Sequence, residues 1–230
     1  MKILAIDTSN QALGVALYND GVVVSEYIKN IKKNHSVQAM PAIEMVLNEA
    51  DMKIADMDRI VVAQGPGSYT GVRIGVTIAK TLAWTLKKEL VGVSSLAVLA
   101  GVGRYFNGFI SPIFDARRGQ VYTGLYRFEN GELVEVIQDC LMMNDQWANL
   151  LKEKEQPILF VGNDSTLHED VFRTILGDKA EFASGTENNP RPGELAKLGE
   201  KLSPVDIHHF VPNYIRLAEA EANWISANEK

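Results

Sequence analysis

A glycine-rich segment carries the strongest sign of chemistry in this 230-residue sequence. Gly65, Gly67, Gly71 and Gly75 lie between the apolar run 60–63 and a stretch with apolar residues at four-residue steps. These patterns predict a buried strand followed by a helix. Because the start of a helix presents unpaired N–H groups and the positive end of its dipole, the segment is a candidate anion-binding loop.

Neither of the two common phosphate-binding loops is present in this segment. The dinucleotide fingerprint needs its third glycine three residues after the second, whereas Gly71 follows Gly67 by four. A Walker A loop needs glycine directly before Lys-Ser/Thr, but the Lys-Thr pair here follows Ala79. The sequence therefore favours packing, with Gly67, Gly71, Gly75 and Ala79 as a small-residue stripe that lets another backbone approach. Phosphate binding stays open as the alternative.

Two aspartates end apolar strands in equivalent surroundings. Asp7 closes the run 3–7 and Asp115 closes the run 113–115; after each come a polar turn, an outgoing strand, a hairpin turn and a returning strand. The repeated plan indicates an internal duplication. Such carboxylates could organise Mg²⁺ or an attacking water in a nucleotide cleft. The sequence favours the other interpretation, in which they cap the turns that follow them.

The elements that position these residues predict an α/β fold of two duplicated lobes, each a mixed sheet with flanking helices, over residues 1–105 and 106–230. In the first lobe we expect strands 3–7, 13–18, 22–28, 60–63 and 90–93 with helices 36–50 and 70–88. In the second we expect strands 113–115, 121–128, 132–137 and 158–161, helices 146–154, 167–176 and 192–201, an irregular segment 204–214, and a final amphipathic helix 217–229.

The composition narrows the class of protein. The hydrophobic content of 46% predicts a globular chain, and the net charge of −6 argues against one that grips nucleic acid alone, since phosphate contacts need clustered Lys and Arg. A single cysteine, Cys140, excludes an intramolecular disulfide and a structural zinc site. An acidic residue at position 7 comes too early for a signal peptide, and the longest uncharged run, 90–103, is too short to span a bilayer. We therefore expect a soluble cytoplasmic protein.

These motifs together resemble the superfamily of actin-like, sugar-kinase and Hsp70 ATPases, and within it the TsaB family, formerly YeaZ. The resemblance covers nearly the whole chain and rests on Ile6-Asp7-Thr8-Ser9, His35-Ser36, the glycine segment 64–75, Asp115-Ala116-Arg117-Arg118 and Pro212-Asn213-Tyr214-Ile215-Arg216. It implies actin-like, ribonuclease H-like lobes that face a nucleotide cleft. The glycine segment is shared with TsaD, the catalytic paralogue, and Asp-Ala-Arg-Arg points to TsaB.

The resemblance implies a non-catalytic partner subunit. With TsaD and the ATPase TsaE, it would support transfer of a threonylcarbamoyl group to a tRNA adenosine, giving threonylcarbamoyladenosine (t6A). TsaD would carry the chemistry and form the heterodimer, TsaE and tRNA would be reached only through the complex, and no cofactor or membrane is expected. The metal-binding histidines of the paralogue fall here on Ser95 and Leu99, which cannot replace imidazole ligands. We therefore expect no catalytic residue and no metal ligand.

Two alternatives to this function stay open. One is an autonomous ATP-binding kinase or ATPase of the actin-like fold. The other, a metallopeptidase of the M22 type, is disfavoured because the chain lacks the metal ligands.

Two sets of site residues follow from the sequence and the resemblance. A vestigial nucleotide cleft is expected at Asp7, Thr8, Ser9, Gly65, Gly67, Asp115 and Arg117. The helix 36–50 is more apolar than a single core stripe requires, which predicts a covered second face, and the resemblance implies a four-helix bundle with the partner. The expected interface is Met40, Ile43, Val46, Leu47, Gly71, Gly75, Ile78 and Leu82. An uncovered apolar face would also favour a homodimer when TsaD is absent. Alternatively, the second face lies under the chain's own C-terminal helix.

Overall fold

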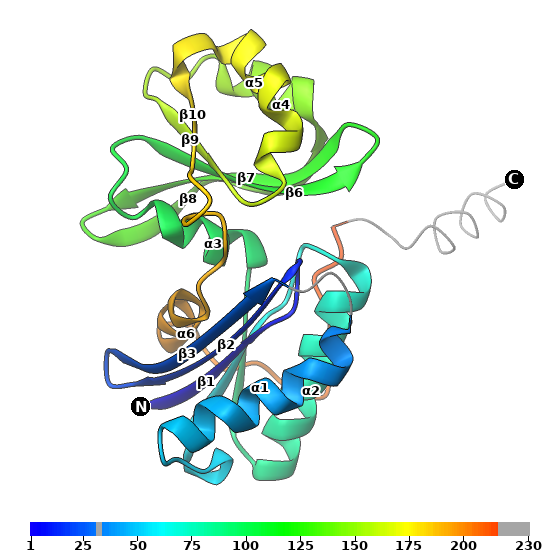
Figure 1. Ribbon diagram of the computed structural model, residues 1–230, viewed down its shortest axis with the longest axis vertical. Helices are drawn as coiled ribbons and strands as arrows, with labels where there is room; N and C mark the ends of the chain where they lie inside the picture. The colour runs from blue at the N-terminus through cyan, green and yellow to red at the C-terminus, as the bar shows by residue number, and fades with distance from the viewer. Residues whose placement is uncertain (31–33, 216–230) are drawn as a thin grey trace, which may run out of the picture.

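The computed structural model describes residues 1–30 and 34–215, and it contains two five-stranded mixed sheets that form two stacked lobes (Figure 1). The first sheet comprises β1 (Lys2–Asp7), β2 (Ala12–Asn19), β3 (Val22–Asn30), β4 (Arg59–Ala63) and β5 (Glu89–Val93). Its strand order is β3-β2-β1-β4-β5, with β1 antiparallel to β2 and parallel to β4. The parallel strands β1 and β4 are therefore buried between layers of helices, as their continuous apolar runs predict.

The second sheet repeats this plan. It comprises β6 (Phe109–Arg117), β7 (Gln120–Glu129), β8 (Glu132–Met143), β9 (Ile158–Val161) and β10 (Ala180–Phe182). Its order is β10-β9-β6-β7-β8, with β6 antiparallel to β7 and parallel to β9, so that β6 takes the place of β1. The α/β fold and the internal duplication are thus confirmed. The short strand β10 was not predicted, because three residues give no measurable periodicity.

Helices α1 (His35–Glu49) and α2 (Tyr69–Leu86) cover one face of the first sheet, as Figure 1 shows. Ala39, Ile43 and Val46 of α1 and Val72 and Val76 of α2 are buried in one core with the strands. These positions recur at steps of three and four, so each helix turns a single stripe towards the sheet. The opposite sides of both helices face outwards.

The other face of the first sheet is covered by α6 (Pro192–Glu200), which comes from the second half of the chain. Residues 192–201 were expected in the second lobe, and this placement is a correction. The guanidinium of Arg59 donates to the carbonyl oxygens of Gly199 (2.8 Å), Glu200 (3.0 Å) and Leu202 (2.9 Å). The backbone N–H of Gly193 donates to Glu26 on β3 (2.8 Å). Both ends of α6 are therefore bonded to the first lobe, whose apolar sheet face would otherwise be exposed.

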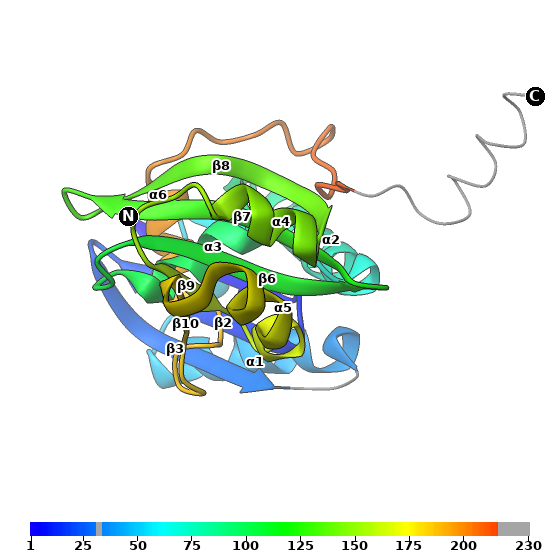
Figure 2. The ribbon, with the colours of Figure 1, turned by 90° about the horizontal axis from the view of Figure 1, so that it is seen from above.

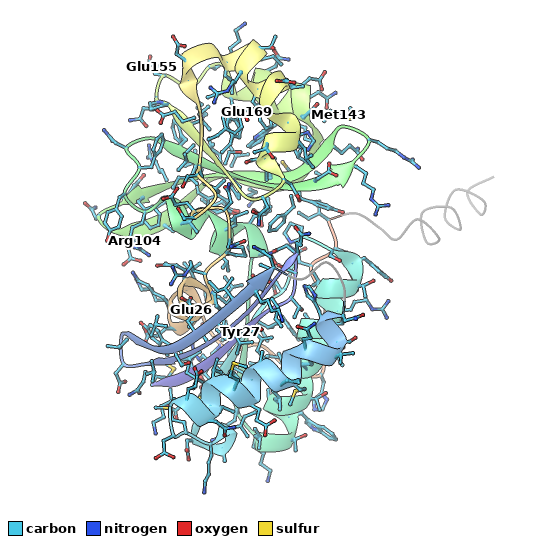
Figure 3. The ribbon with its side chains drawn as sticks, in the orientation of Figure 1. Glu26, Tyr27, Arg104, Met143, Glu155 and Glu169 are labelled. Atoms are coloured by element: carbon cyan, nitrogen blue, oxygen red, sulfur yellow. The ribbon has the colours of Figure 1, made fainter. Side chains whose placement is uncertain are left out.

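Figure 3 shows Glu26 and Arg104 on the side of the molecule where α6 lies. Arg104 donates to Glu194 of α6 at 2.5 Å and to the carbonyl oxygen of Gly131 at 3.1 Å, and thereby connects α6 to the second lobe. The expected boundary between residues 105 and 106 stays a prediction, because α6 follows the second lobe in the sequence but packs on the first.

The second lobe carries α4 (Asn144–Leu151) and α5 (Glu169–Leu176) on its outer face (Figures 1 and 2). Trp147 and Phe172 are fully buried there, and the ring of Phe172 stacks on that of Phe160 with centroids 4.2 Å apart. A short helix that was not predicted, α3 (Ser95–Ala100), lies between the lobes. Four 3₁₀ segments complete the described elements: Ile54–Asp56, Gly101–Gly103, Ser165–His168 and Gly177–Lys179.

The expected irregular segment is confirmed, because residues 204–214 contain no helix or strand. The helix expected over residues 217–229 lies outside the described residues, as does Arg216. Within the ranges 1–30 and 34–215, no helix combines the length and apolar character needed to cross a bilayer.

Candidate functional site

A cleft of about 820 Å³ lies between the two lobes. It is lined by the β1–β2 turn, the starts of α1 and α2, the β6–β7 turn and Asp164 after β9. Of the residues predicted for a nucleotide cleft, the structure brings Ser9, Gly67, Asp115 and Arg117 together in its wall. Asp7, Thr8 and Gly65 are buried and do not line it.

The wall formed by the first lobe is closely packed around the glycines. The hydroxyl of Thr8 donates to the carbonyl oxygen of Gly71 at 2.7 Å, and the N–H of Ser68 donates to that of Ser9 at 2.7 Å. A Cβ added at Gly67 or Gly71 would collide with the carbonyl oxygen of Ser9 or Thr8, respectively. The predicted close backbone approach is confirmed, and the neighbour is a turn of this chain. The carbonyl oxygens of Ser9 and Thr8 occupy the space beside these two glycines, which favours packing over phosphate binding.

Asp7 is held inside this wall, with 1% of its surface exposed. Its Oδ1 accepts hydrogen bonds from the N–H (2.8 Å) and the hydroxyl (2.7 Å) of Ser9, whereas Oδ2 has no partner among the described residues. Burial raises the pKa of Asp7, and the hydrogen bonds from Ser9 and the nearby His35 oppose that shift. The ring of His35 donates from Nε2 to the carbonyl oxygen of Asn10 at 2.8 Å. Asp7 therefore caps the turn, as one interpretation of the sequence predicted.

The wall formed by the second lobe is more open and carries a carboxylate pair. The N–H of Asp115 donates to Oδ2 of Asp164 at 2.9 Å, and its own Oδ1 accepts from the N–H of Arg117 at 3.2 Å. Nε2 of His168 lies 3.2 Å from the same Oδ1, and Nδ1 lies 3.0 Å from the amide nitrogen of Asn144. Since the Asn144 amide donates to Nδ1, the proton of a neutral His168 lies on Nε2 and points at Asp115. Burial raises the pKa of Asp164.

The sequence reasoning missed Asp164, His168 and Asn144. A signal was available for one of them, because Gly162-Asn163-Asp164 directly follows a buried strand and Asp115 was already noted at the end of the neighbouring one. No spacing in the sequence could have linked His168 to Asp115, since a 3₁₀ turn after β9 brings them together.

A second feature is an apolar surface on α1 and α2, which we call the helix face. It consists of large apolar side chains that are exposed or half-buried: Val37, Met40, Met45, Tyr69, Ile74, Ile78, Leu82 and Trp84. Val37 and Trp84 are the most exposed, at 69% and 65%. A groove of about 420 Å³ runs along it, lined by Ser36, Tyr69, Thr70, Arg73, Ile74, Thr77 and Ile78.

The helix face differs from the predicted interface set. Met40 is exposed and Ile78 and Leu82 are half-buried, whereas Ile43, Val46, Leu47, Gly71 and Gly75 are buried inside the lobe. The physical reason is the phase of the helices. Positions 39, 42, 43, 46 and 47 of α1 form the stripe that packs on the sheet, which leaves 37, 40, 41, 44 and 45 for the surface. Five of the eight residues predicted for the interface therefore lie inside the lobe, and three lie at its surface; the interface itself stays a prediction.

The positions of the paralogue's histidines lie in α3. Ser95 is fully buried and its hydroxyl accepts from the N–H of Gly65 at 3.0 Å, and Leu99 is fully buried between the lobes. Among the residues that the structure describes, no three His, Cys, Asp or Glu side chains are grouped so as to hold a metal ion. Burial raises the pKa of the half-buried Cys140, which keeps its thiol protonated, as expected for a packed cysteine.

Two lobes of one topology around a cleft define a protein of the actin-like ATPase fold. The ROK hexokinase from Thermus thermophilus shares this fold, with a TM-score of 0.52 and 9% identity over 87% of this chain and 99% of that one. YeaZ from Pseudomonas aeruginosa is nearer, with a TM-score of 0.77 and 24% identity over 93% of this chain and 99% of that one.

The sequence comparisons identify the family. The family model of TsaD, described as tRNA N6-adenosine threonylcarbamoyltransferase, matches residues 22–224. The tRNA threonylcarbamoyladenosine biosynthesis protein TsaB of Bacillus subtilis is 56% identical over 229 residues, which cover 100% of both chains. The chain belongs to the TsaB family.

Proposed function

We propose that this chain acts in the biosynthesis of t6A as a non-catalytic subunit that pairs with TsaD. Full-length identity of 56% to a protein named for t6A biosynthesis supports the pathway. The helix face supports the pairing, because large apolar side chains gathered on one exposed surface mark an interaction site. TsaE and tRNA are reached through the complex, and two copies of the chain pair through the same face when TsaD is absent.

The state of the cleft supports the absence of catalysis. In the first-lobe wall, the carboxylate that could organise a metal or water, Asp7, is buried and bonded to its own turn. The carbonyl oxygens of Ser9 and Thr8 occupy the space beside Gly67 and Gly71. A catalytic carboxylate has to reach the reacting atoms within hydrogen-bond distance, directly or through one water. Asp7 cannot do so without opening the wall.

The experiment that tests the proposed function is reconstitution from purified components. TsaD and TsaE should transfer threonylcarbamoyl to tRNA when this chain is present and lose that activity when it is omitted. Asp7→Asn and Asp115→Asn variants should restore the activity as well as the natural chain does. Undiminished transfer without the chain would refute the supporting role. Folded variants that bind TsaD but fail to restore transfer would refute the absence of catalysis.

A second candidate function, autonomous ATP binding, is favoured by one observation. Asp115 and Asp164 line the cleft and are within reach of a ligand there. Calorimetric titration of the isolated chain with Mg-ATP separates the candidates. Tight binding that Asp115→Asn removes would favour the ATPase, whereas no heat of binding would leave the scaffold function as the better account.

A further inference from the structure

A carboxylate of the second lobe is bonded to the start of α3. Oδ2 of Asp139, on β8, accepts from the hydroxyl of Ser94 at 2.5 Å, and Oδ1 accepts from the hydroxyl of Tyr126 on β7. Ser94 directly follows β5 of the first lobe and directly precedes α3. Neither Ser94 nor Asp139 lines the cleft. Their hydrogen bond therefore joins the two lobes at a second place.

The strand β7 is irregular where it meets this carboxylate. The register of its pairing with β8 shifts between Thr123 and Leu125, and a Cβ added at Gly124 would lie 2.8 Å from Oδ1 of Asp139. A register shift of this kind re-aims side chains, and a glycine inside a strand marks a place of close approach. The strand thus leaves room for the Asp139 carboxylate beside the start of α3.

The hydrogen bonds of this cluster favour the ionised form of Asp139. The Ser94 oxygen accepts from the N–H groups of Leu96 and Ala97, each at 3.1 Å, so its own proton points at Asp139. The hydroxyl of the buried Tyr126 donates as well. Hydrogen bonds to an ionised acceptor are about twice as strong as those to a neutral one. Both bonds therefore weaken when Asp139 gains a proton.

The surroundings of Asp139 favour the protonated form. Burial raises the pKa of Asp139, and the hydrogen bonds from Ser94 and Tyr126 oppose that shift. The negative charge of Glu135, on the same strand, adds to the rise. The next residue, Cys140, is a neutral thiol, and α3 carries no titratable side chain. The two hydroxyl groups thus hold the carboxylate in its ionised form against the effect of its burial.

The same end of α3 is bonded to the first lobe one residue later. The hydroxyl of Ser95 accepts from the N–H of Gly65 at 3.0 Å, and the N–H of Ser95 donates to the carbonyl oxygen of Gly65 at 3.0 Å. The apolar side chains of α3 are shared between the cores of the two lobes (Figure 1). Because the glycine segment continues from Gly65 into the cleft wall at Gly67, the start of α3 connects Asp139 to the cleft.

We propose that Asp139 is a proton-dependent latch between the lobes. As a carboxylate it holds Ser94 and fixes the second lobe against the glycine segment. When it gains a proton it releases Ser94, and the separation of the two cleft walls changes. The lobes stay joined beside α6, where Lys201 pairs with Glu132. Because that pairing lowers the pKa of Glu132, this connection persists at the pH that opens the latch.

The test titrates the full-length chain and follows the amide signals of Leu96 and Ala97 by ¹H–¹⁵N spectroscopy. Both signals should move together as the pH falls from 7 towards the ordinary aspartate value of 3.8, and Asp139→Asn should abolish the movement. Asp178→Asn, which removes an exposed carboxylate elsewhere on the second lobe, should keep it. Signals that stay in place, or that move equally in Asp139→Asn, would overturn the latch.

A second variant keeps the test decisive if Asp139→Asn does not fold. Tyr126→Phe removes one donor to the carboxylate, so the midpoint of the titration should rise by about one pH unit. An unchanged midpoint would overturn the latch, because the hydroxyl groups would then not hold the ionised form.

A further measurement examines the cleft itself. Spin labels at Gln11, in the first-lobe wall, and at Thr166, in a 3₁₀ turn of the second lobe, report the separation of the lobes in a Cys140→Ser background. The distribution of distances should change on acidification, and should already differ at neutral pH when Asp139→Asn is added. Asp178→Asn should leave it as it is. A distribution that responds neither to acid nor to Asp139→Asn would refute the movement of the lobes, and with it the latch.

Discussion

The two lobes share a strand order but use their outer helices differently. In the second lobe, α4 and α5 bury Trp147 and Phe172 completely, and their exposed large apolar residue is Leu150. In the first lobe, α1 and α2 expose Val37, Met40, Met45, Tyr69 and Trp84. Duplicated folds need the same core, so that difference lies outside what folding requires. It supports the proposal that the first lobe carries the interaction surface.

The two aspartate turns show the same divergence within the cleft. Oδ1 of Asp7 accepts from the N–H two residues later, and Oδ1 of Asp115 does the same. The α2 glycines contact the turn after Asp7, and this turn is buried. At Asp115, a 3₁₀ turn places Asp164 and His168 within hydrogen-bond distance, and the Asp115 carboxylate stays half-exposed. The wall of the first lobe is closely packed, whereas the wall of the second lobe presents accessible polar groups.

The largest effect should come from filling the glycine contact of the first lobe. Gly71→Val places a branched side chain against the carbonyl oxygen of Thr8, and overpacking against backbone should lower the free energy of unfolding by about 4 kcal/mol. Urea unfolding monitored by circular dichroism measures it. Gly185→Ala is the control, because no atom lies within 4 Å of a Cβ there. Equal stability of both variants would contradict the close packing of the first-lobe wall.

We expect a slightly smaller loss of stability when the end of α6 loses its hydrogen bonds to the first lobe. Arg59→Leu removes a buried guanidinium that donates to three carbonyl oxygens of residues 199–202 and pairs with Glu89 at 2.7 Å. The carbonyl oxygens lose charged donors, so the free energy of unfolding should fall by about 3 kcal/mol. Arg59→Lys should retain part of the stability that Arg59→Leu loses. Hydrogen exchange that stays unchanged in α6 of Arg59→Leu would show that other contacts hold the helix.

Charge introduced on the two outer helix layers compares them as interaction surfaces. Met45→Arg on the helix face should weaken TsaD binding by about 2 kcal/mol, roughly thirtyfold, because a desolvated apolar contact becomes an unpaired charge. Leu150→Arg, at a similar exposure on α4, should leave the affinity unchanged. Val46→Arg is not a fair test, since Val46 is buried and the variant should unfold. Calorimetry with both surface variants decides, and equal losses would remove the distinction between the lobes.

The smallest effect concerns the buried carboxylate of the first lobe. Because burial raises the pKa of Asp7, the folded chain holds its proton more tightly than the unfolded chain does. Stability should therefore fall as pH rises from the ordinary value of 3.8 through the raised pKa. Asp7→Asn, which keeps an acceptor for Ser9, should gain stability relative to the natural chain as pH increases to 7. Thermal melts at several pH values test this, and parallel pH curves for the two chains would contradict it.

Much of the fold could be predicted from local patterns. The strand 158–161 matched β9, and the helices 36–50 and 70–88 matched α1 and α2 within two residues at each end. The repeat of strand, Asp, turn and hairpin in the sequence predicts the duplication. What local pattern could not give was the location of α6, because its amphipathic stripe fits either apolar sheet face, and long-range bonds to Arg59 and Glu26 choose between them.

The candidate site divides in the same way. Residue types and spacing determined that Asp7, Asp115 and the glycine stripe would lie at strand ends and at a helix start, since strand and helix periods are properties of the sequence alone. Only the tertiary structure decided that Gly71 contacts Thr8, that Met45 faces outwards while Val46 faces the sheet, and that Asp164 and His168 meet Asp115. These outcomes depend on the rotation of each helix against its sheet, which is fixed by packing between residues far apart in the chain.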